Sequence, residues 1–357
     1  CGRVVGAGEA LPSEDVKANK GDTYMSVIPG LRLRWMRWTG ALPKASKMEA
    51  KRRVLQEEYA RFQEYRSSDA YARFEALQAE MERGDTSNAR EYKSLLKSRE
   101  LRKFQQQSER GVFKELEGRK ELFFDDFDGS SLDKQRWITK FFWGEALLGR
   151  PYSLSTDPQC YTDGQNVRLS NGRMVIETRA EQKESLCWDS KLGMMRKQFD
   201  YTSGVVCSGS SFRMPYGRIE VKVRFHFQPG VYHALYLVGN RMSPQLDVFR
   251  TDPNDGRLVR GVYSEGELQR DGNVEVHREE EAVGRLPFSS EFFILAVEWN
   301  RAEVSWSVNG YPYMTRKISF SGEPMYLVFA SGIAPGAEPS GTAAMEVDWV
   351  RCLSPQR

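Results

Sequence analysis

Short runs of alternating apolar and polar residues divide the chain from residue 121 onward, and this pattern limits the fold more than any other feature. A period of two is typical of a half-buried β-strand, because successive side chains point to opposite faces. Turn residues separate the runs roughly every 8–12 residues, and Asn171-Gly172 and Asn309-Gly310 are hairpin dipeptides. The runs include 166–170, 173–178, 218–225 and 303–308. Many short strands without helices between them predict a mainly β sandwich over 121–357.

Residues 46–120 predict a small helical domain that precedes the sandwich. The segment has no proline and three glycines, and it is rich in good helix formers. Phe62, Tyr65, Ser68, Tyr71 and Phe74 recur thirty residues later as Tyr92, Leu95, Ser98, Leu101 and Phe104. Ser68 and Ser98 are N-cap residues, each opening a new helix. We expect about four short helices in two similar pairs, serving as a protein-contact surface, a spacer or a structural extension.

Residues 1–45 contain scattered Gly and Pro without a sustained period, which predicts an extended tether or arm. Within it, residues 31–38 alternate apolar and basic side chains, as a half-exposed strand would. This stretch is expected either to pack on its own protein as an edge strand or arm, or to lie against a membrane or a partner.

The chain begins with Cys1 rather than Met. A mature chain that starts with Cys is what the lipoprotein signal peptidase leaves, so Cys1 is the expected lipidation site of a bacterial outer-membrane lipoprotein, the surface-facing side being favoured over the periplasmic one. The alternative is a chain cut at a chance Cys. No apolar run approaches 18 residues, and a net charge of +3 argues against nucleic acid as a partner.

The remaining cysteines have no CxxC or Cys/His spacing that would indicate zinc. They are Cys160, Cys187, Cys207 and Cys352. In an oxidising envelope one disulfide could form among the first three, and buried free thiols are the alternative. The three histidines are too dispersed to suggest a metal site.

Several segments resemble glycoside hydrolase family 16, the laminarinase and β-glucanase family. They occur in the family's order over about 121–353 and are 124–137, 165–172, 201–208, 212–222, 292–299, 306–310, 324–327 and 345–351. The resemblance implies a two-sheet, concanavalin-like jelly roll whose concave face holds a polysaccharide. Together with the preceding helices, the chain resembles lipoproteins of the Bacteroides group.

The catalytic strand departs from the family pattern. Active members carry Glu-x-Asp-x-x-Glu, in which a β-bulge returns the last residue to the face of the first two. The aligned residues here are Gln245, Asp247 and Arg250. A neutral amide is a poor nucleophile, and a guanidinium stays protonated and cannot act as acid and base. The substitutions predict that the chain is not an enzyme and that Asp247 is structural.

Other residues are candidates for a relocated catalytic pair or for ligand binding. Glu265 and Glu267 have the i, i+2 spacing of a relocated carboxylate pair, whereas Glu279–Glu281 has the composition of a solvated loop. The aromatic side chains expected to bind a glycan are Trp143, Tyr152, Trp188 and Tyr232. Relatives can hold a structural Ca²⁺, and the matching residues are Asp126, Gly172 and Asp348.

Three functions follow from these observations. The first is a non-catalytic lipoprotein that serves as an accessory or scaffold subunit of an outer-membrane protein complex. The second is a surface glycan-binding lipoprotein, and the third is a glycoside hydrolase with a relocated site.

Overall fold

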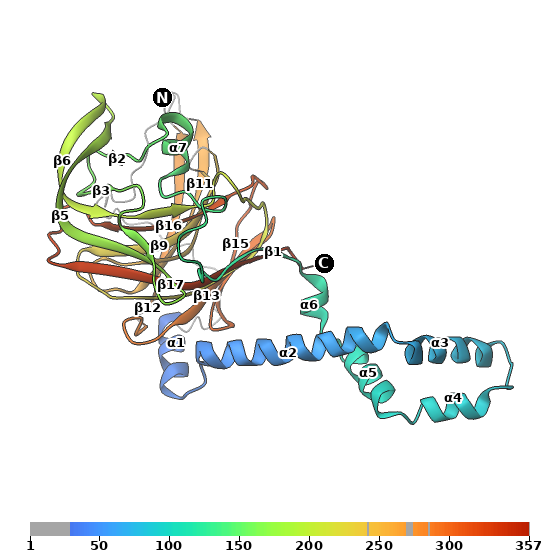
Figure 1. Cartoon of the computed structure of the whole chain (residues 1–357). Helices are drawn as coiled ribbons and strands as arrows, with labels where there is room; N and C mark the ends of the chain where they lie inside the picture. The colour runs from blue at the N-terminus through green and yellow to red at the C-terminus, as the bar shows by residue number, and fades with distance from the viewer. Residues whose placement is uncertain (1–28, 241–242, 269–273, 285, 357) are drawn as a thin grey trace. The chain divides into compact units, whose positions relative to one another are not determined.

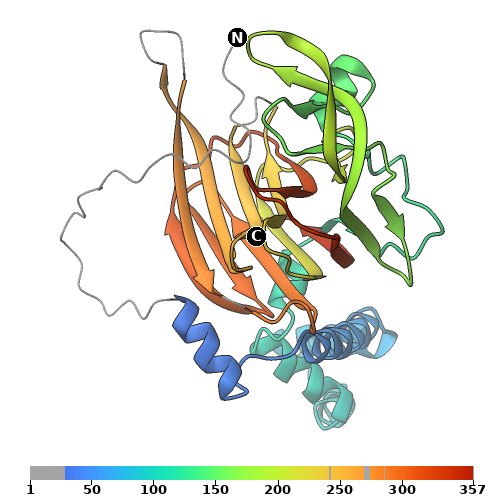
Figure 2. The same ribbon diagram turned by 90° about the vertical axis from the view of Figure 1, so that its left-hand side faces the viewer.

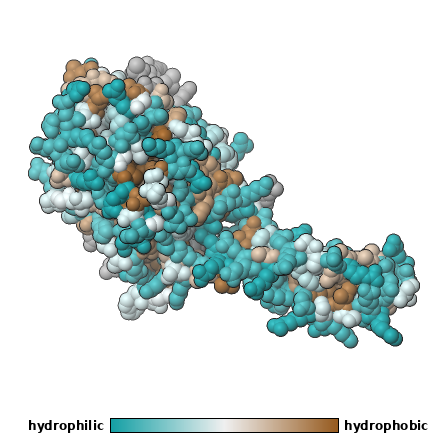
Figure 3. Space-filling model, in the orientation of Figure 1, coloured by the Kyte–Doolittle hydropathy of each residue, from teal (hydrophilic) through white to brown (hydrophobic). Residues whose placement is uncertain are grey.

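The structure is a computed structural model that describes residues 29–240, 243–268, 274–284 and 286–356 (Figure 1). These residues form two compact units. One contains the described residues up to Ala45 together with Glu121–Pro355, and the other contains Ser46–Lys120 with Gln356. Hydrophilic side chains cover most of the face seen in Figure 3, as the 28% of charged residues leads one to expect.

The larger unit is the mainly β two-sheet sandwich that the alternating runs predicted. Its first sheet has the order β15-β14-β13-β8-β17-β5-β6-β3, with β1, β2 and β4 attached. These strands are β1 (Glu121–Asp125), β2 (Ser153–Leu154), β3 (Gln159–Tyr161), β4 (Val167–Leu169), β5 (Met174–Asp189), β6 (Gly193–Ser203), β8 (Gly217–Phe225), β13 (Phe293–Trp299), β14 (Glu303–Val308), β15 (Tyr311–Lys317) and β17 (Thr342–Leu353). One helix, α7 (Phe142–Leu148), lies between β1 and β2 in the sequence.

The second sheet has six strands in the order β12-β11-β10-β9-β16-β7, all antiparallel to their neighbours. They are β7 (Val205–Cys207), β9 (Val231–Val238), β10 (Gln245–Thr251), β11 (Leu258–Leu268), β12 (Val274–Gly284) and β16 (Tyr326–Ile333). Figure 2 shows the long β11–β12 hairpin on one side of this unit and the green segment with α7 on the other.

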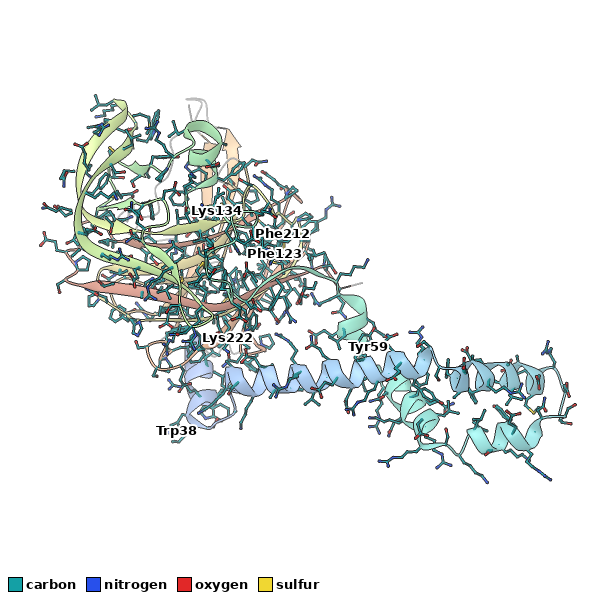
Figure 4. All side chains as sticks on the ribbon, in the orientation of Figure 1. Trp38, Tyr59, Phe123, Lys134, Phe212 and Lys222 are labelled. Atoms are coloured by element: carbon teal, nitrogen blue, oxygen red, sulfur yellow. The ribbon has the colours of Figure 1, made fainter. Side chains whose placement is uncertain are left out.

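Apolar side chains from the inner faces of both sheets form one core. Trp306 and Trp299 of the first sheet and Phe329 of the second are at most 1% exposed. Phe123 of β1 stacks on Phe212 at 4.8 Å between ring centroids and joins the edge of this core (Figure 4). Such burial is the main source of stability for a sandwich of this size.

The prediction of a strand at 31–38 is wrong, because this stretch belongs to helix α1 (Pro29–Trp38). Leu33 and Met36, three residues apart, share one face of the helix and enter the sandwich core together with Leu42. Trp38 is 85% exposed on the helix (Figure 4). Residues 29–45 therefore pack on their own protein, while residues 1–28, including Cys1 and most of the predicted tether, lie outside the described residues.

The smaller unit consists of α2 (Ala45–Arg66), α3 (Asp69–Glu82), α4 (Ala89–Leu95), α5 (Arg99–Glu109) and α6 (Lys114–Gly118). Ser68 and Ser98 accept hydrogen bonds from the third residue after them, at 3.2 Å each, and so act as the N-caps of α3 and α5.

The repeat in the smaller unit has a structural consequence. Phe62 of the first copy stacks on Phe104 of the second at 4.5 Å, and Phe74 of the first stacks on Tyr92 of the second at 5.7 Å. Positions 62 and 92 are equivalent in the repeat, as are 74 and 104, so the two contacts are the same contact with the copies exchanged. The two helix pairs thus meet through a pseudo-two-fold arrangement.

All four cysteines of the β unit are free and buried. The alternative with a disulfide among Cys160, Cys187 and Cys207 is therefore not realised. Cys160 and Cys187 instead pack with Phe199 in one small apolar cluster. Burial raises the pKa of the Cys207 thiol to about 12, so this group is an inert core residue at neutral pH.

Candidate active site

Gln245, Asp247 and Arg250, at the positions of the family's catalytic motif, lie together on one face of the six-stranded sheet. We call this the outer face, because it is turned away from the first sheet. The register between β10 and β9 shifts between Asp247 and Phe249, and this is the bulge expected from the motif spacing. Gln245 Nε2 donates to Asp247 Oδ1 at 3.1 Å, and Arg250 Nη2 lies 3.2 Å from Asp247 Oδ2. The bulge thus brings residue 250 back to the face of 245 and 247.

Two further residues complete the site, and sequence reasoning missed both. Arg250 Nη2 also contacts the Tyr263 hydroxyl of β11 and Glu280 Oε1 of β12, and Tyr263 donates to the same Glu280 oxygen. Residues 279–281 form part of β12, paired with Val262, Gly261 and Arg260, so their interpretation as a loop is wrong. The signal that could have revealed them is the alternation that begins at Val274-Glu-Val.

Burial governs the electrostatics of this site. Asp247 is 1% exposed, and burial raises the pKa of its carboxyl, although the Arg250 charge opposes the shift. The pKa of Arg250 is raised, because the Asp247, Tyr263 and Glu280 charges outweigh the effect of burial. Burial also raises the pKa of Tyr263. The Arg250 guanidinium is therefore a permanent cation between two carboxyl groups. Asp247 is buried, whereas the Glu280 side chain is 26% exposed.

The relocated pair proposed from spacing, Glu265 and Glu267, lies on β11. Their side chains are outside the described part of the chain, so the relocated pair stays a prediction. The expected glycan-binding residues fall into different surroundings. Trp143 stacks on Phe141 at 5.1 Å within an apolar cluster, and Trp188 is 40% exposed on β5 of the other sheet.

Tyr152 and Tyr232 lie around a carboxylate that the sequence did not single out, Asp157. Burial raises the pKa of Tyr232 to about 12, with the Asp157 charge next in importance, and the same two causes raise the pKa of Tyr152 to about 12. Asp157 Oδ2 accepts a hydrogen bond from the Leu154 amide at 2.8 Å. Burial nevertheless raises the pKa of Asp157 to about 6. A carboxyl group that titrates near neutrality is suited to acid–base work or to hydrogen bonding with sugar hydroxyls.

Asp348, one of the residues named for calcium, is already paired with cations. Asp348 Oδ2 lies 2.6 Å from Lys222 Nζ, and Arg173 Nε lies 3.6 Å from Oδ1. Two cations already compensate this carboxylate, whereas Ca²⁺ needs uncompensated oxygen ligands. Within the described ranges no group of three or more His, Cys, Asp or Glu could hold a metal ion. Calcium at Asp126, Gly172 and Asp348 stays a prediction.

The expected lipid anchor at Cys1 lies outside the described residues and stays a prediction, as do the protein partners and the outer-membrane location. None of the described helices has the length and apolar character needed to cross a membrane.

The fold is similar to those of solved polysaccharide-degrading enzymes. A variant of LamA from Zobellia galactanivorans, solved in complex with laminaritriose and laminaritetraose, superposes with a TM-score of 0.53 at 17% identity, covering 66% of this chain and 99% of the other. The κ-carrageenase of Pseudoalteromonas carrageenovora gives 0.54 at 18% identity, covering 66% and 95%. At these identities the likeness shows the jelly-roll fold.

Several curated proteins with detectable sequence similarity are named as glucanases or glycanases. A glucan endo-1,3-β-glucosidase of Niallia circulans is 24% identical over 271 residues, covering 66% of this chain and 38% of the relative. An endo-1,3-1,4-β-glycanase of Rhizobium meliloti is 26% identical over 252 residues, covering 66% and 51%. The chain thus spans about half or less of these relatives. Their activities contradict the prediction that the chain is not an enzyme, which rested on two motif positions alone.

A family model also matches the chain. The model for glycosyl hydrolases family 16 matches residues 155–351, which is more than half of the chain and includes β10, β11 and β12. The segments that carried the resemblance, the bulged strand and the two-sheet architecture agree with this match. The chain belongs to glycoside hydrolase family 16.

Proposed function

We propose that this chain is a glycoside hydrolase that cleaves a β-linked glucan on the outer face of the six-stranded sheet, using Glu280 and Asp247. One observation carries the proposal: both carboxylates contact the same nitrogen, Arg250 Nη2. Their contacting oxygens are therefore at most about 6 Å apart, close to the roughly 5–5.5 Å between the carboxyl groups of a retaining glycosidase.

The surroundings of the two groups suggest different roles. Arg250 and Tyr263 stabilise negative charge on Glu280, and its 26% exposure lets it reach a substrate. Glu280 would attack the anomeric carbon as the bond to the leaving oxygen breaks. Asp247 is 1% exposed and has a pKa raised by burial, and it would give that oxygen its proton once the sugar displaces the Arg250 side chain that contacts it. Water would then cleave the glycosyl ester and return a proton to Asp247.

The relatives' names support a β-1,3-linked or mixed-linkage glucan as the substrate. Gln245 and Arg250, which replace the family's usual carboxylates, would then position Asp247 and Glu280 rather than react themselves. The two carboxylates would then lie on β10 and β12, whereas the family motif places its carboxylates on one strand.

The test is reducing-end release from β-1,3-glucan and mixed-linkage glucan by the purified full chain. Glu280→Gln and Asp247→Asn should each lower the rate by about 10²–10⁴-fold, the usual contribution of one positioned acid, base or nucleophile. Glu279→Gln is the matched control, since Glu279 is exposed on the same strand next to Glu280. Absence of release from both glucans, or full activity of Glu280→Gln, would overturn the proposal.

A further inference from the structure

The outer face of the six-stranded sheet is not open along its whole width. Every residue of β16 is buried, although the sheet has only one inner face. Leu327 and Phe329 belong to the core between the sheets, whereas Tyr326, Val328 and Ala330, on the opposite face, belong to a separate cluster and are 0–3% exposed. Something other than the first sheet must therefore cover this part of the outer face.

The cover is the segment 138–161, which includes α7 and which we call the cover segment. Its Phe142 ring packs on Tyr326 of β16 at 5.4 Å. Its Phe141 ring packs at 4.9 Å on Tyr161, the last residue of the cover segment. Ile138 forms a β-bridge with Cys207 of β7. Tyr236 of β9, next to Asp247 in the β9–β10 register, lies at the margin of the same cluster.

An ion-pair network braces the cover segment itself, and Arg213 joins the segment to the sheet. Lys140 Nζ lies 3.0 Å from Glu145 Oε2 of α7 and 3.2 Å from Asp163 Oδ2, and the Lys140 side chain is only 13% exposed. Arg213 lies over the Phe142 ring at 4.5 Å and over the Tyr326 ring at 4.8 Å. Partly buried cations of this kind contribute more than exposed ion pairs do, so we treat the cover as a fixed wall.

The covered half contrasts with the half that carries the proposed catalytic groups. On β10, β11 and β12 the side chains of Arg250, Tyr263 and Glu280 reach the surface. The boundary runs along β9, where Tyr236 packs against the covered cluster and pairs with Val328 of β16. Nearby Asp157 and Tyr161 influence the pKa of Tyr232 on the same strand. A sugar chain that crosses the strands from β12 toward β16 thus meets a wall of tyrosines beside Asp157.

We propose that this wall makes the binding surface blind-ended, so that the protein acts on the ends of glucan chains rather than at internal positions. The proposal rests on the proposed function, since it uses the same site. Asp157 and Tyr232 would hydrogen-bond the hydroxyl groups of the terminal sugar, because a carboxylate and a phenol can together pair with adjacent hydroxyls. An internal segment of a polymer could not enter without displacing Phe142 from Tyr326.

The first test compares ligands with and without chain ends. Calorimetry would measure binding of a linear β-1,3-linked hexasaccharide and of a cyclic β-1,3-glucan to the full chain carrying Glu280→Gln. A blind-ended surface binds the linear ligand at least tenfold more tightly than the cyclic one. Equal affinity for the two, or no affinity for the linear ligand, would overturn the inference. This readout needs no hydrolysis, so failure of the proposed catalysis is detected separately.

The second test uses the wild-type chain and variants at the wall. Reducing ends released from the polymer should rise while the viscosity barely falls, whereas a rapid loss of viscosity would show internal cleavage and overturn the inference. Asp157→Asn should weaken binding of the linear hexasaccharide about tenfold, as expected for a lost charged hydrogen bond. Asp200→Asn, at an exposed position of β6, is the control and should bind as the wild type does. Unchanged binding by Asp157→Asn would refute the recognition of the chain end.

Discussion

Replacing Arg250 by Met tests the central ion-pair network of the site. Asp247 is 1% exposed, and its second oxygen lies 3.2 Å from the Arg250 guanidinium. Removing one partner of a buried pair leaves an uncompensated charge and typically costs about 3–5 kcal/mol. The more exposed Glu280 should add at most about 1 kcal/mol. We therefore expect the free energy of unfolding to fall by about 3–5 kcal/mol at pH 8.

The loss should depend on pH in a defined direction. Burial already raises the pKa of Asp247, and Arg250 opposes this rise. Without Arg250 the pKa must rise further, and a raised carboxyl pKa means that stability is fully present at low pH and lost as the pH rises through the folded-state value. The stability difference between Arg250→Met and the wild type should therefore be small near pH 4 and reach its full size near pH 8.

The assay is urea unfolding followed by tryptophan fluorescence at pH 4 and pH 8. All eight tryptophans lie outside residues 46–120, so the signal reports the sandwich without the helical unit. The double variant Asp247→Asn/Arg250→Met removes the charge as well as its partner and should recover most of the lost stability at pH 8. An equal loss at both pH values, or no recovery in the double variant, would refute the buried-pair reasoning.

Three further predictions concern other parts of the chain. Phe104→Ala and Phe74→Ala, related by the pseudo-two-fold arrangement, should each destabilise the helical unit by about 3–5 kcal/mol in thermal melts followed by circular dichroism; a large loss from only one of them would contradict the symmetry. Asp157 has a pKa raised from 3.8 to about 6, so its contribution is present below pH 3.8 and lost as the pH rises through 6. Relative to Asp157→Asn, the wild type should thus lose up to about 3 kcal/mol of unfolding free energy between pH 3 and pH 8, and a difference independent of pH would disprove the burial argument. Excising 46–118 should leave a sandwich that unfolds cooperatively. Removing 1–118 should also lower its free energy of unfolding by several kcal/mol, because the buried side chains of α1 contribute about 1.5–3 kcal/mol each. Equal melting temperatures for the two truncated chains would show that α1 contributes nothing.

Local patterns were informative wherever a short stretch of chain determines the outcome. The alternation over 218–225 and 303–308 predicted β8 and β14, because a strand exposes and buries successive side chains. Ser68 and Ser98 were predictable N-caps, since a cap depends on a hydrogen bond to a residue three positions away. The motif spacing of residue 250 likewise predicted the bulge in β10.

The strand prediction failed where one pattern fits both a strand and a helix. Residues 31–38 alternate as a strand does, yet Leu33 and Met36 also fit one face of a helix. The sandwich core, which accepts both side chains together, decides between the two structures. Local sequence carries no information about that core, because its residues come from strands far away in the chain.

The sequence by itself determined that this protein has a β sandwich of family 16 type and that the usual motif positions hold Gln245, Asp247 and Arg250. Only the tertiary structure showed that Glu280, thirty residues further along, meets Arg250 beside Asp247. It also showed that the cover segment closes half of the outer face. The physical reason is the same in both cases. Strand order and register bring together side chains whose separation in the sequence is arbitrary, and no local periodicity records which distant residue will fill a site.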